Sequence, residues 1–447
     1  MQRTVAGDVF TTLLSFLGSA IDGWPEPRGG KNTRYAMSDI AMSAFACFFC
    51  QSPSFLAFQR LMEQGRGINN AGTMFGVEKL PTDNQIRNVL DEVAPAHLQP
   101  VFRDTFAYLQ QREVVESFRS IANTLLVAID GSGYFYSEKI HCQFCTVARH
   151  RNGRVSYSHN ALLPAVVTPE HSQVIPLEPE YILPQEGHKR QDCELVAAQR
   201  WINSMGPRYG PLAITLLGDA LYAVQPLIEL VVRQEMDYLF VAKPSAHKHL
   251  YEELESIRAL GEIDELTRTR WTGRRHETLT YRYLNDVTLT SNPDSVTVNW
   301  VELTITAEGG KVVRHAFVTN HLITPENVED LVAAGRCRWK IENEEINTLK
   351  TKGYHFEHNF GHGKQHLSES LLSLNILAFL FHTVLELLDE QCSHPRKRLP
   401  RRDTFFQHIA TLPQYLCFAS WQSLLRFMIR GLQEGPRPPP DASEIIH

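Results

Sequence analysis

Residues 124–133 read Thr-Leu-Leu-Val-Ala-Ile-Asp-Gly-Ser-Gly, and this stretch decides the fold class. Its short continuous apolar run, 125–129, is typical of a strand that is buried on both faces. Asp130 and the glycines after it predict that this strand ends in a turn. Residues 212–219, Leu-Ala-Ile-Thr-Leu-Leu-Gly-Asp, have the same pattern, so a second buried strand is predicted to end at Asp219.

Strand and helix patterns alternate around these two segments, which indicates an α/β sheet. The helical pattern upstream extends to about residue 120. The other predicted elements are strands at 161–167 and 238–242 and helices at 193–205 and 222–234.

The pattern changes twice in the second half of the chain. Residues from about 264 to 320 alternate and are rich in Val and Thr, which is typical of β-strands. After Pro325 a helical pattern returns and continues to about residue 390. The proline-rich residues 435–447 are predicted to form a disordered tail.

The composition is that of an ordinary globular chain, with 447 residues of which 43% are hydrophobic and 21% charged. Its net charge of −6 does not favour a nucleic-acid partner, but phosphate contacts depend on local basic clusters rather than on the total. Either of the two basic clusters could instead be a solvated loop. These clusters are Arg268, Arg270, Arg274, Arg275 and His276, and Arg396, Lys397, Arg398, Arg401 and Arg402.

Cysteine usage and apolar segments predict where the protein is found. Eight cysteines spread over a chain of this length are not a disulfide scaffold, so a reducing, cytoplasmic setting is predicted. Cys47 and Cys50 form a CxxC pair inside an apolar helical stretch, which favours core packing over metal binding. Residues 371–388 are very apolar, but interruptions such as Asn375 and Glu386 favour a buried helix over a membrane span.

Asp130 and Asp219 are the first candidates for chemistry, because each directly follows a predicted buried strand. In open α/β sheets, ligands bind beyond the carboxyl ends of the strands. Two carboxylates there can share a divalent cation such as Mg²⁺, which takes oxygen ligands. The alternative is that each Asp only caps its turn, which is a common role.

A predicted helix at 338–350 offers further acids. At 3.6 residues per turn, Arg338, Glu342, Glu345 and Leu349 are predicted to share one broad face. The spacing alone also fits an ordinary charge pair between residues four apart on an exposed helix.

The run Arg338-Trp-Lys-Ile-Glu342 resembles the third catalytic motif of DDE transposases of the bacterial insertion-sequence class. That motif reads Tyr, two residues, Arg, three residues, Glu, six residues, Lys. Asp130, in Ile-Asp-Gly-Ser, and Asp219, in Leu-Gly-Asp-Ala, resemble the first and second catalytic Asp. Residues 353–364, Gly-Tyr-His-Phe-Glu-His-Asn-Phe-Gly-His-Gly-Lys, resemble the segment that follows in one branch of the family. The likeness extends over about residues 80–390.

The chain departs from the motif at two positions. Gly335 stands where the motif has Tyr, which puts that residue's DNA contact in doubt. Lys350 lies eight residues after Glu342, where the motif places Lys seven after the Glu. Glu344 and Glu345 therefore remain rivals for the third acid, although the spacing from the arginine favours Glu342.

The resemblance implies a ribonuclease-H-like α/β core, a mixed sheet flanked by helices with the two Asp on strands and the Glu on a later helix. It also implies a β-rich insertion between the second Asp and the Glu, and helical regions at both ends. The predicted divisions are a helical, DNA-end-binding region at 1–118, the core at 119–262 and 323–390, the β-rich insertion at 263–322, and a helical region with the disordered tail at 391–447.

The implied activity is cleavage at transposon ends and strand transfer into target DNA by in-line displacement at phosphorus. It requires two Mg²⁺ ions, which Mn²⁺ can replace, with Asp130 expected to bridge both and Asp219 and Glu342 to hold one each. Arg338 and Lys350 are expected to position the DNA backbone through phosphate contacts. The implied partners are double-stranded DNA and a second copy of the chain, so the protein is expected to be a homodimer on DNA in the nucleoid.

Two further DNA contacts are hypotheses. Trp271, which lies near Arg274 and Arg275, is a candidate for stacking on an extruded base, as in transposases that form hairpin ends. The alternative is a Trp that anchors the β-rich insertion. The helix predicted at 85–93 could enter the major groove, or it could be purely structural, since Arg87 is its one basic residue.

Zinc is a second cofactor hypothesis. Cys142 and Cys145 form another CxxC pair, with three histidines and a further cysteine nearby in the sequence, and Cys and His are zinc ligands. No regular four-ligand spacing is evident, so buried thiols beside Asp130 are the alternative. The nearby residues are His141, His150, His159 and Cys193.

Three rival functions are open. A ribonuclease-H-like nuclease without strand transfer would keep the three acids but need no end-recognition region. A retired transposase that only binds DNA would need none of the acids. A phosphatase with paired Asp would explain neither the Arg338–Glu342 run nor the β-rich stretch.

Overall fold

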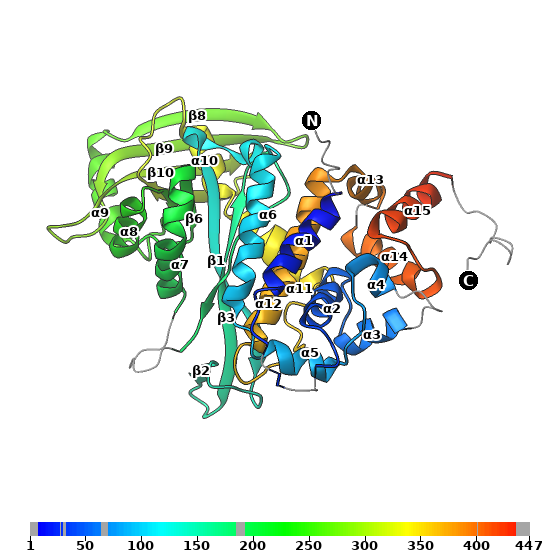
Figure 1. The fold of residues 1–447 in the computed structure, drawn as a ribbon. Coiled ribbons are helices and arrows are strands. Elements are labelled where there is room, and N and C mark those ends of the chain that lie inside the picture. Colours follow the sequence, from blue (N-terminus) through cyan, green and yellow to red (C-terminus); the bar gives the residue numbers. More distant parts are fainter. Residues whose placement is uncertain are drawn as a thin grey trace, which may run out of the picture.

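A computed structural model describes residues 8–434 except 27, 30–32, 64–69, 185–192 and 400. The predicted disordered tail at 435–447 lies outside these residues. The described chain is a mixed α/β protein with one large sheet and helices packed around it (Figure 1). The strands of this sheet are β1 Leu125–Ser137, β2 Thr146–Arg149, β3 Val155–Val167, β4 Ile175–Pro176, β5 Glu180–Ile182, β6 Ile214–Gly218, β7 Asp237–Val241, β8 Asp264–Trp271, β9 His276–Thr288, β10 Thr297–Ala307 and β11 Val312–Thr319.

The sheet has the order β2-β3-β1-β6-β7-β11-β10-β9-β8, and the short strands β4 and β5 also pair with β3. At its centre β1, β6 and β7 run parallel, and every other neighbouring pair is antiparallel. The β-rich stretch, β8 to β11, therefore continues the same sheet through the pairing of β11 with β7. Helix α7 (Glu194–Tyr209) precedes β6 in the chain, and α8 (Gln225–Arg233) connects β6 to β7. Parallel neighbouring strands need a crossover connection of this kind.

The prediction that the first strand stops at Asp130 is wrong, because β1 continues to Ser137. The long strand β3 pairs with β1 along this whole stretch, so the glycines lie in the ladder instead of a turn. A Cβ atom at Gly131 would overlap the Glu194 carboxylate, and one at Gly133 would lie 3.1 Å from the side-chain oxygen of Asn160. These glycines serve close approach inside a strand rather than a reversal of the chain.

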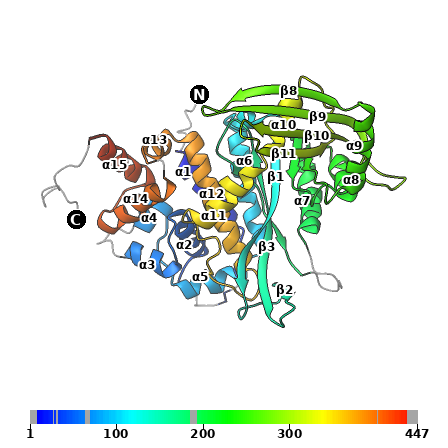
Figure 2. The ribbon, with the colours of Figure 1, turned by 180° about the vertical axis from the view of Figure 1, so that it is seen from behind.

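Helices from both ends of the chain form one body beside the sheet, and the views in Figures 1 and 2 agree on this. Phe10 stacks near Trp421, with ring centroids 5.3 Å apart, and Phe45 lies 5.1 Å from Phe381. The two terminal regions thus share a core. The helices of this body are α1 Val9–Ile21, α2 Met37–Phe49, α3 Phe55–Glu63, α4 Asn70–Phe75, α5 Asp83–Leu90, α6 Gln99–Gln111, α12 Leu367–Leu388, α13 Glu390–Arg398, α14 Arg402–Tyr415 and α15 Trp421–Glu434.

Helix α12 is the central helix of this body. In the described part of the chain it alone is long and apolar enough to cross a membrane, but 83% of its most apolar window is buried inside the protein. That burial is what a core helix shows, in agreement with the predicted buried helix. Cys47 and Cys50 are also buried in this core, and burial raises the pKa of the Cys50 thiol to about 12.

Candidate active site

Two neighbouring parallel strands bring Asp130 and Asp219 to the same level of the sheet. Ala128 on β1 pairs with Leu217 on β6, and each Asp lies two residues further along its strand direction. Asp219 directly follows β6, and its carboxylate accepts a hydrogen bond of 2.8 Å from the backbone N–H of Leu221. It therefore caps its turn and faces the cavity described below.

The third predicted acid, Glu342, reaches the strands from a distorted helix. After α10 (Val328–Arg336), the chain forms a π-helical turn, η6 (Ile341–Ile346), and then the short helix α11 (Asn347–Thr351). This turn packs against β1 and β3. The buried guanidinium of Arg338 donates a hydrogen bond of 2.7 Å to Glu342 and lies over the Trp339 ring, 5.0 Å from its centroid. Arg338 and Glu342 thus form an ion pair on the turn that packs against β1.

The electrostatics of Asp130 show which groups converge on it. Its pKa is raised to about 7, first by burial and then by the negative charge of Glu342, with smaller contributions from Glu194 and Asp219, and Arg338 opposes the rise. A bound cation would reduce this repulsion between the carboxylates. Their oxygen ligands are those that Mg²⁺ prefers.

Glu344 and Glu345 lie elsewhere. Glu345 is 1% exposed and packs inside the protein, where burial raises its pKa well above the usual range. Glu344 is exposed and lines a separate cavity of about 600 Å³, together with Lys352 and Arg401. Glu342 is therefore the one of the three that the structure brings to Asp130.

The prediction that Arg338, Glu342, Glu345 and Leu349 share one face is wrong beyond the first pair, because Glu345 and Leu349 are buried while Glu342 faces the cavity. The physical reason is the π-helical turn, whose wider winding rotates the residues after Glu342 relative to a regular α-helix. Such turns are rare inside helices and occur frequently at functional sites.

Glu194 is a fourth acid at this site that the sequence analysis missed. It is the first residue of α7, accepts a hydrogen bond of 3.2 Å from the backbone N–H of Gly131, and also accepts one from the Tyr222 hydroxyl. The predicted start of a helix at residue 193 was its one signal in the sequence. Nothing in that pattern indicates that the helix begins against β1.

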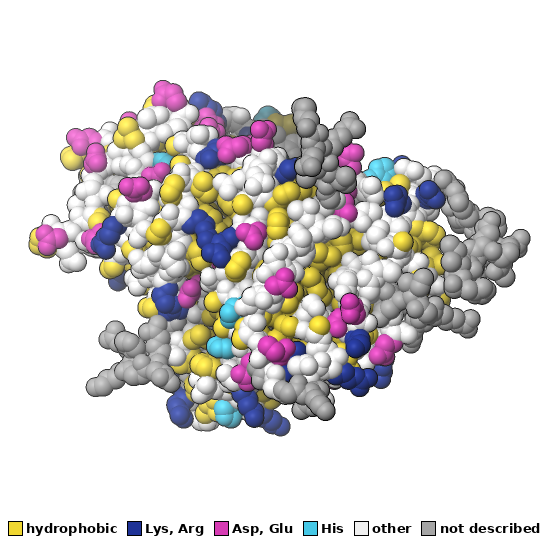
Figure 3. Space-filling model, viewed as in Figure 1, with side chains coloured by type: hydrophobic (Ala, Val, Ile, Leu, Met, Phe, Trp, Pro, Cys, Tyr) yellow, Lys and Arg dark blue, Asp and Glu magenta, His cyan; other side chains and the backbone are white. Residues whose placement is uncertain are grey.

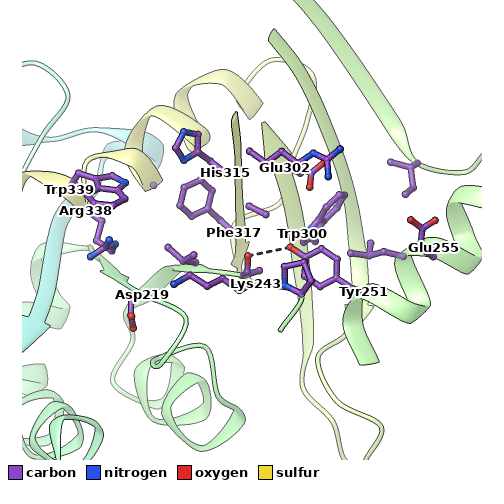
Figure 4. A pocket seen from close by; sticks show the side chains of 18 of the residues that line it. Asp219, Lys243, Tyr251, Glu255, Trp300, Glu302, His315, Phe317, Arg338 and Trp339 are labelled. Carbon is purple, nitrogen blue, oxygen red and sulfur yellow. Dashed lines mark hydrogen bonds between the residues drawn. The ribbon is translucent and has the colours of Figure 1, made fainter. Parts of the chain in front are cut away.

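A cavity of about 730 Å³, which Asp219 and Glu342 line but Asp130 does not, extends across β7, β10 and β11. Asp219, Arg338 and Trp339 lie at one end, and Tyr251 and Trp300 line the other, with Lys243 between them (Figure 4). Aromatic and charged side chains thus line both ends of the cavity, since Glu255 and Glu302 lie near Trp300 and Tyr251.

Gly335 also lines this cavity, at the position where the resemblance expects Tyr. A Cβ atom there would lie 2.8 Å from the ring of Phe317, so any larger residue would displace that ring. The glycine is therefore required by the packing of β11 against α10.

The predicted DNA-contact residues of the β8–β9 hairpin lie apart from the cavity. Trp271, at the end of β8, is 57% exposed and packs against His276, whereas Trp300 is buried and lines the cavity. Arg275 forms an ion pair of 3.2 Å with Glu277, and Arg274 is exposed in the turn. Trp300 therefore lines the cavity, at the end away from Asp219, whereas Trp271 lies outside it.

Several other predicted basic contacts are engaged within the protein. Lys350 forms an ion pair of 2.9 Å with Glu357. In α5, Arg87 forms an ion pair with Asp83 and donates a hydrogen bond of 2.7 Å to the carbonyl of Phe360, so this side chain has a structural role.

The second basic cluster is also partly internal, because Arg396 and Arg402 both form ion pairs with Glu386. On the face shown in Figure 3, Lys and Arg are dispersed among Asp and Glu and do not form one basic surface.

The Cys/His residues form a second cluster at the far end of β1 and β3. Cys142, Cys145 and His159 come together, and His362, which the sequence analysis missed, joins them from the segment after α11. His141 instead stacks on Tyr157.

The two remaining zinc candidates also lie outside this cluster. His150 lies within hydrogen-bonding distance of the Ser156 hydroxyl, at 2.8 Å, and Cys193 is exposed beside α7. Within the described residues, the Cys/His cluster is the one group whose potential metal ligands all lie within 4.8 Å of one another, so the acids are more widely spaced.

Comparison with known proteins adds no family to this description. No protein-family model matches the chain, and no curated protein matches its sequence.

Proposed function

We propose that this protein is a DNA transposase of the DDE type, with Asp130, Asp219 and Glu342 as its metal-binding acids. The observation that carries the proposal is the convergence on Asp130 of two carboxylates from separate parts of the chain, Asp219 on the adjacent strand and Glu342 on a later helix. Partly buried carboxylates that repel one another are stabilised when a cation binds between them.

The architecture supports a ribonuclease-H-like core. The chain order is a strand with Asp130, helix α7, a strand ending at Asp219, and the helical turn with Glu342, in a mixed sheet flanked by helices. Four antiparallel strands stand between the second Asp and the Glu, where the resemblance expects a β-rich insertion.

The π-helical turn accounts for the unusual spacing of Lys350. Compared with a regular α-helix, one such turn accommodates one additional residue. On this helix, a lysine eight residues after Glu342 therefore lies on the side of the axis where a regular α-helix would place a lysine seven residues after it. The departure from the motif is thus compatible with the same role for Lys350.

In the proposed reaction, a phosphodiester of the transposon end binds in the cavity beside the acids. Two Mg²⁺ ions, when held by Asp130, Asp219 and Glu342, would supply Lewis-acid activation of the attacking oxygen and stabilisation of the leaving oxygen. Arg338 keeps Glu342 oriented and presents positive charge where the phosphate oxygens lie. Glu194 fixes the backbone of Gly131, next to Asp130, through its hydrogen bond.

Asp130 must lose its proton to bind a cation. Because its pKa is raised to about 7, protons compete with the metal near neutral pH, and metal affinity is expected to rise as the pH rises through that value. The proposed partners are double-stranded DNA and a second copy of the chain, since two transposon ends must be joined, and the proposed location is the bacterial cytoplasm.

The test is Mg²⁺-dependent cleavage of the DNA that flanks the gene, with Glu342→Gln compared with Glu344→Gln. We expect the first variant to be inactive and the second to cut within about twofold of the wild type, because Glu344 faces another cavity. Equal loss in both variants would contradict the assignment of the third acid.

A strand-transfer assay on supercoiled target DNA separates the transposase from the rival functions. Joined products are expected for the transposase. Cleavage without joining would favour the ribonuclease-H-like nuclease, and binding of the ends without cleavage would favour a protein that only binds DNA.

A further inference from the structure

The Cys/His cluster has the dimensions of a tetrahedral zinc site. The sulfur atoms of Cys142 and Cys145 lie 3.9 Å apart, and the Nε2 atom of His159 lies 3.5 Å from the first and 3.4 Å from the second. The Nε2 atom of His362 lies 3.5 Å from the Cys145 sulfur. With Zn–S bonds of about 2.3 Å and Zn–N bonds of about 2.0 Å, a tetrahedral ion separates two sulfurs by roughly 3.8 Å and sulfur from nitrogen by roughly 3.5 Å.

We propose that Cys142, Cys145, His159 and His362 bind one Zn²⁺ ion, at a site distinct from the acids. Two thiolates and two imidazoles are a complete ligand set for a structural zinc site, with no position left for water or substrate. The inference does not depend on the proposed transposase activity, because it rests on these four side chains alone.

The local backbone fits the role of Cys142 as a thiolate ligand. The backbone N–H of Phe144 donates to the Cys142 sulfur at 3.3 Å, and the backbone N–H of Cys145 donates to the Cys142 carbonyl at 3.3 Å. This turn directs both sulfurs of the CxxC pair to the same side. An N–H donor to a sulfur is the kind of outer contact that orients and stabilises a metal-bound thiolate.

The four ligands come from three segments that the rest of the fold must hold together. The CxxC pair lies between β1 and β2, His159 lies on β3 opposite Phe135 of β1, and His362 lies in the segment between α11 and α12. That last segment directly follows the helix that carries Glu342. A zinc ion would therefore tie the chain after the third acid to the end of the strand that carries the first.

The segment between α11 and α12 also contacts the helical body, through hydrogen bonds and ring packing. The Asp91 carboxylate accepts backbone hydrogen bonds from Lys364, at 3.0 Å, and from Gln365, at 2.9 Å, and the Phe360 ring packs against Phe48. Zinc would complete a bridge from the sheet, through this segment, to the helices. Loss of the ion is thus expected to loosen the segment without removing any of the acids.

The first test measures zinc in the full-length protein, purified without a histidine tag, by mass spectrometry of the metal. We expect one zinc per chain in the wild type, almost none in Cys145→Ser or His362→Ala, and full retention in His141→Ala. His141 is the matched control, because it adjoins Cys142 in the sequence but stacks on Tyr157. His362→Cys supplies a different zinc ligand at the same position and is expected to restore binding.

Co²⁺ exchange gives a readout that does not depend on the folding of the variants. The wild type loaded with Co²⁺ is expected to show the visible absorption of a tetrahedral thiolate site. Cys142 and Cys145 should then be protected from thiol reagents until a chelator is added. Wild-type protein without stoichiometric metal, with both thiols freely reactive or joined as a disulfide, would overturn the proposal, as would equal loss of zinc in His141→Ala and His362→Ala.

Discussion

The two ligand clusters, the three acids and the Cys/His cluster, differ in how closely their ligand atoms approach one another. In the Cys/His cluster all four ligand atoms lie within 4.8 Å of one another, and four of their six separations, at 3.4–3.9 Å, are close to those around a tetrahedral zinc ion. At the acids, Glu342 is held by Arg338, and Asp219 caps its own turn. Uncharged imidazoles can lie close to sulfur atoms without repulsion, whereas partly buried carboxylates repel one another.

The two clusters also differ in their access to a cavity. Asp219 and Glu342 line a cavity of about 730 Å³, whereas the four Cys/His ligands do not. We therefore expect changes at the acids to abolish activity and leave the fold intact, and changes at the Cys/His cluster to destabilise the fold and leave the activity.

Asp130→Asn is expected to reduce Mg²⁺-dependent cleavage by about 10³-fold or more, which corresponds to about 4 kcal/mol in the barrier. The amide keeps the shape of the side chain but is a poor ligand for two cations. Binding to the DNA ends, measured by gel shift, should remain within about threefold. Cleavage at the wild-type rate would remove Asp130 from the site.

Removal of zinc is expected to lower the melting temperature by about 5 °C or more, because metal that binds only the folded protein adds directly to its stability. Cys145→Ser should melt at the same lowered temperature and should not respond to a chelator. Cleavage by this variant, measured well below its melting temperature, should stay within about threefold of the wild type. A loss of activity as large as that of Asp130→Asn would show that the two clusters are not separate in function.

Gly131→Ala is expected to cost about 1–3 kcal/mol in the free energy of unfolding, because the new methyl group overlaps the Glu194 carboxylate. Combined with Glu194→Ala, which removes the clashing group, the same change should cost less than half as much in urea denaturation. Gly133→Ala is the control, since its methyl group would meet the end of one flexible Asn160 side chain at 3.1 Å. Equal costs of Gly131→Ala in the wild type and in Glu194→Ala would mean that Glu194 does not lie against β1.

The smallest expected effect is a pH-dependent shift in melting temperature of a few degrees. The folded-state pKa of Asp130 is about 7, above its usual 3.8, so the charged group destabilises the fold fully above pH 7 and not at all below about pH 4. Without metal, the melting temperature of the wild type should therefore fall relative to that of Asp130→Asn as the pH rises between these values. Added Mg²⁺ should reverse the loss at pH 8 in the wild type alone, and a parallel response in both proteins would contradict this account.

The strands and helices whose signals are local could be predicted from the amino-acid pattern. The apolar runs before Asp130 and Asp219, the Val- and Thr-rich stretch, and the buried helix α12 each correspond to an element of the structure. The same pattern also indicated three acids, through a resemblance whose spacing singles out Glu342. These features could be predicted because periodicity and strand-end position are properties of neighbouring residues.

Which distant residues meet could be seen only in the folded chain. His362 lies 217 residues after Cys145, and Glu194 lies 63 residues after Gly131, so no spacing rule could pair them. The extension of β1 through its glycines depended on the length of β3, and the burial of Glu345 depended on a π-helical turn. In each case the deciding contact joins segments that are far apart in the chain, and a local pattern carries no information about such contacts.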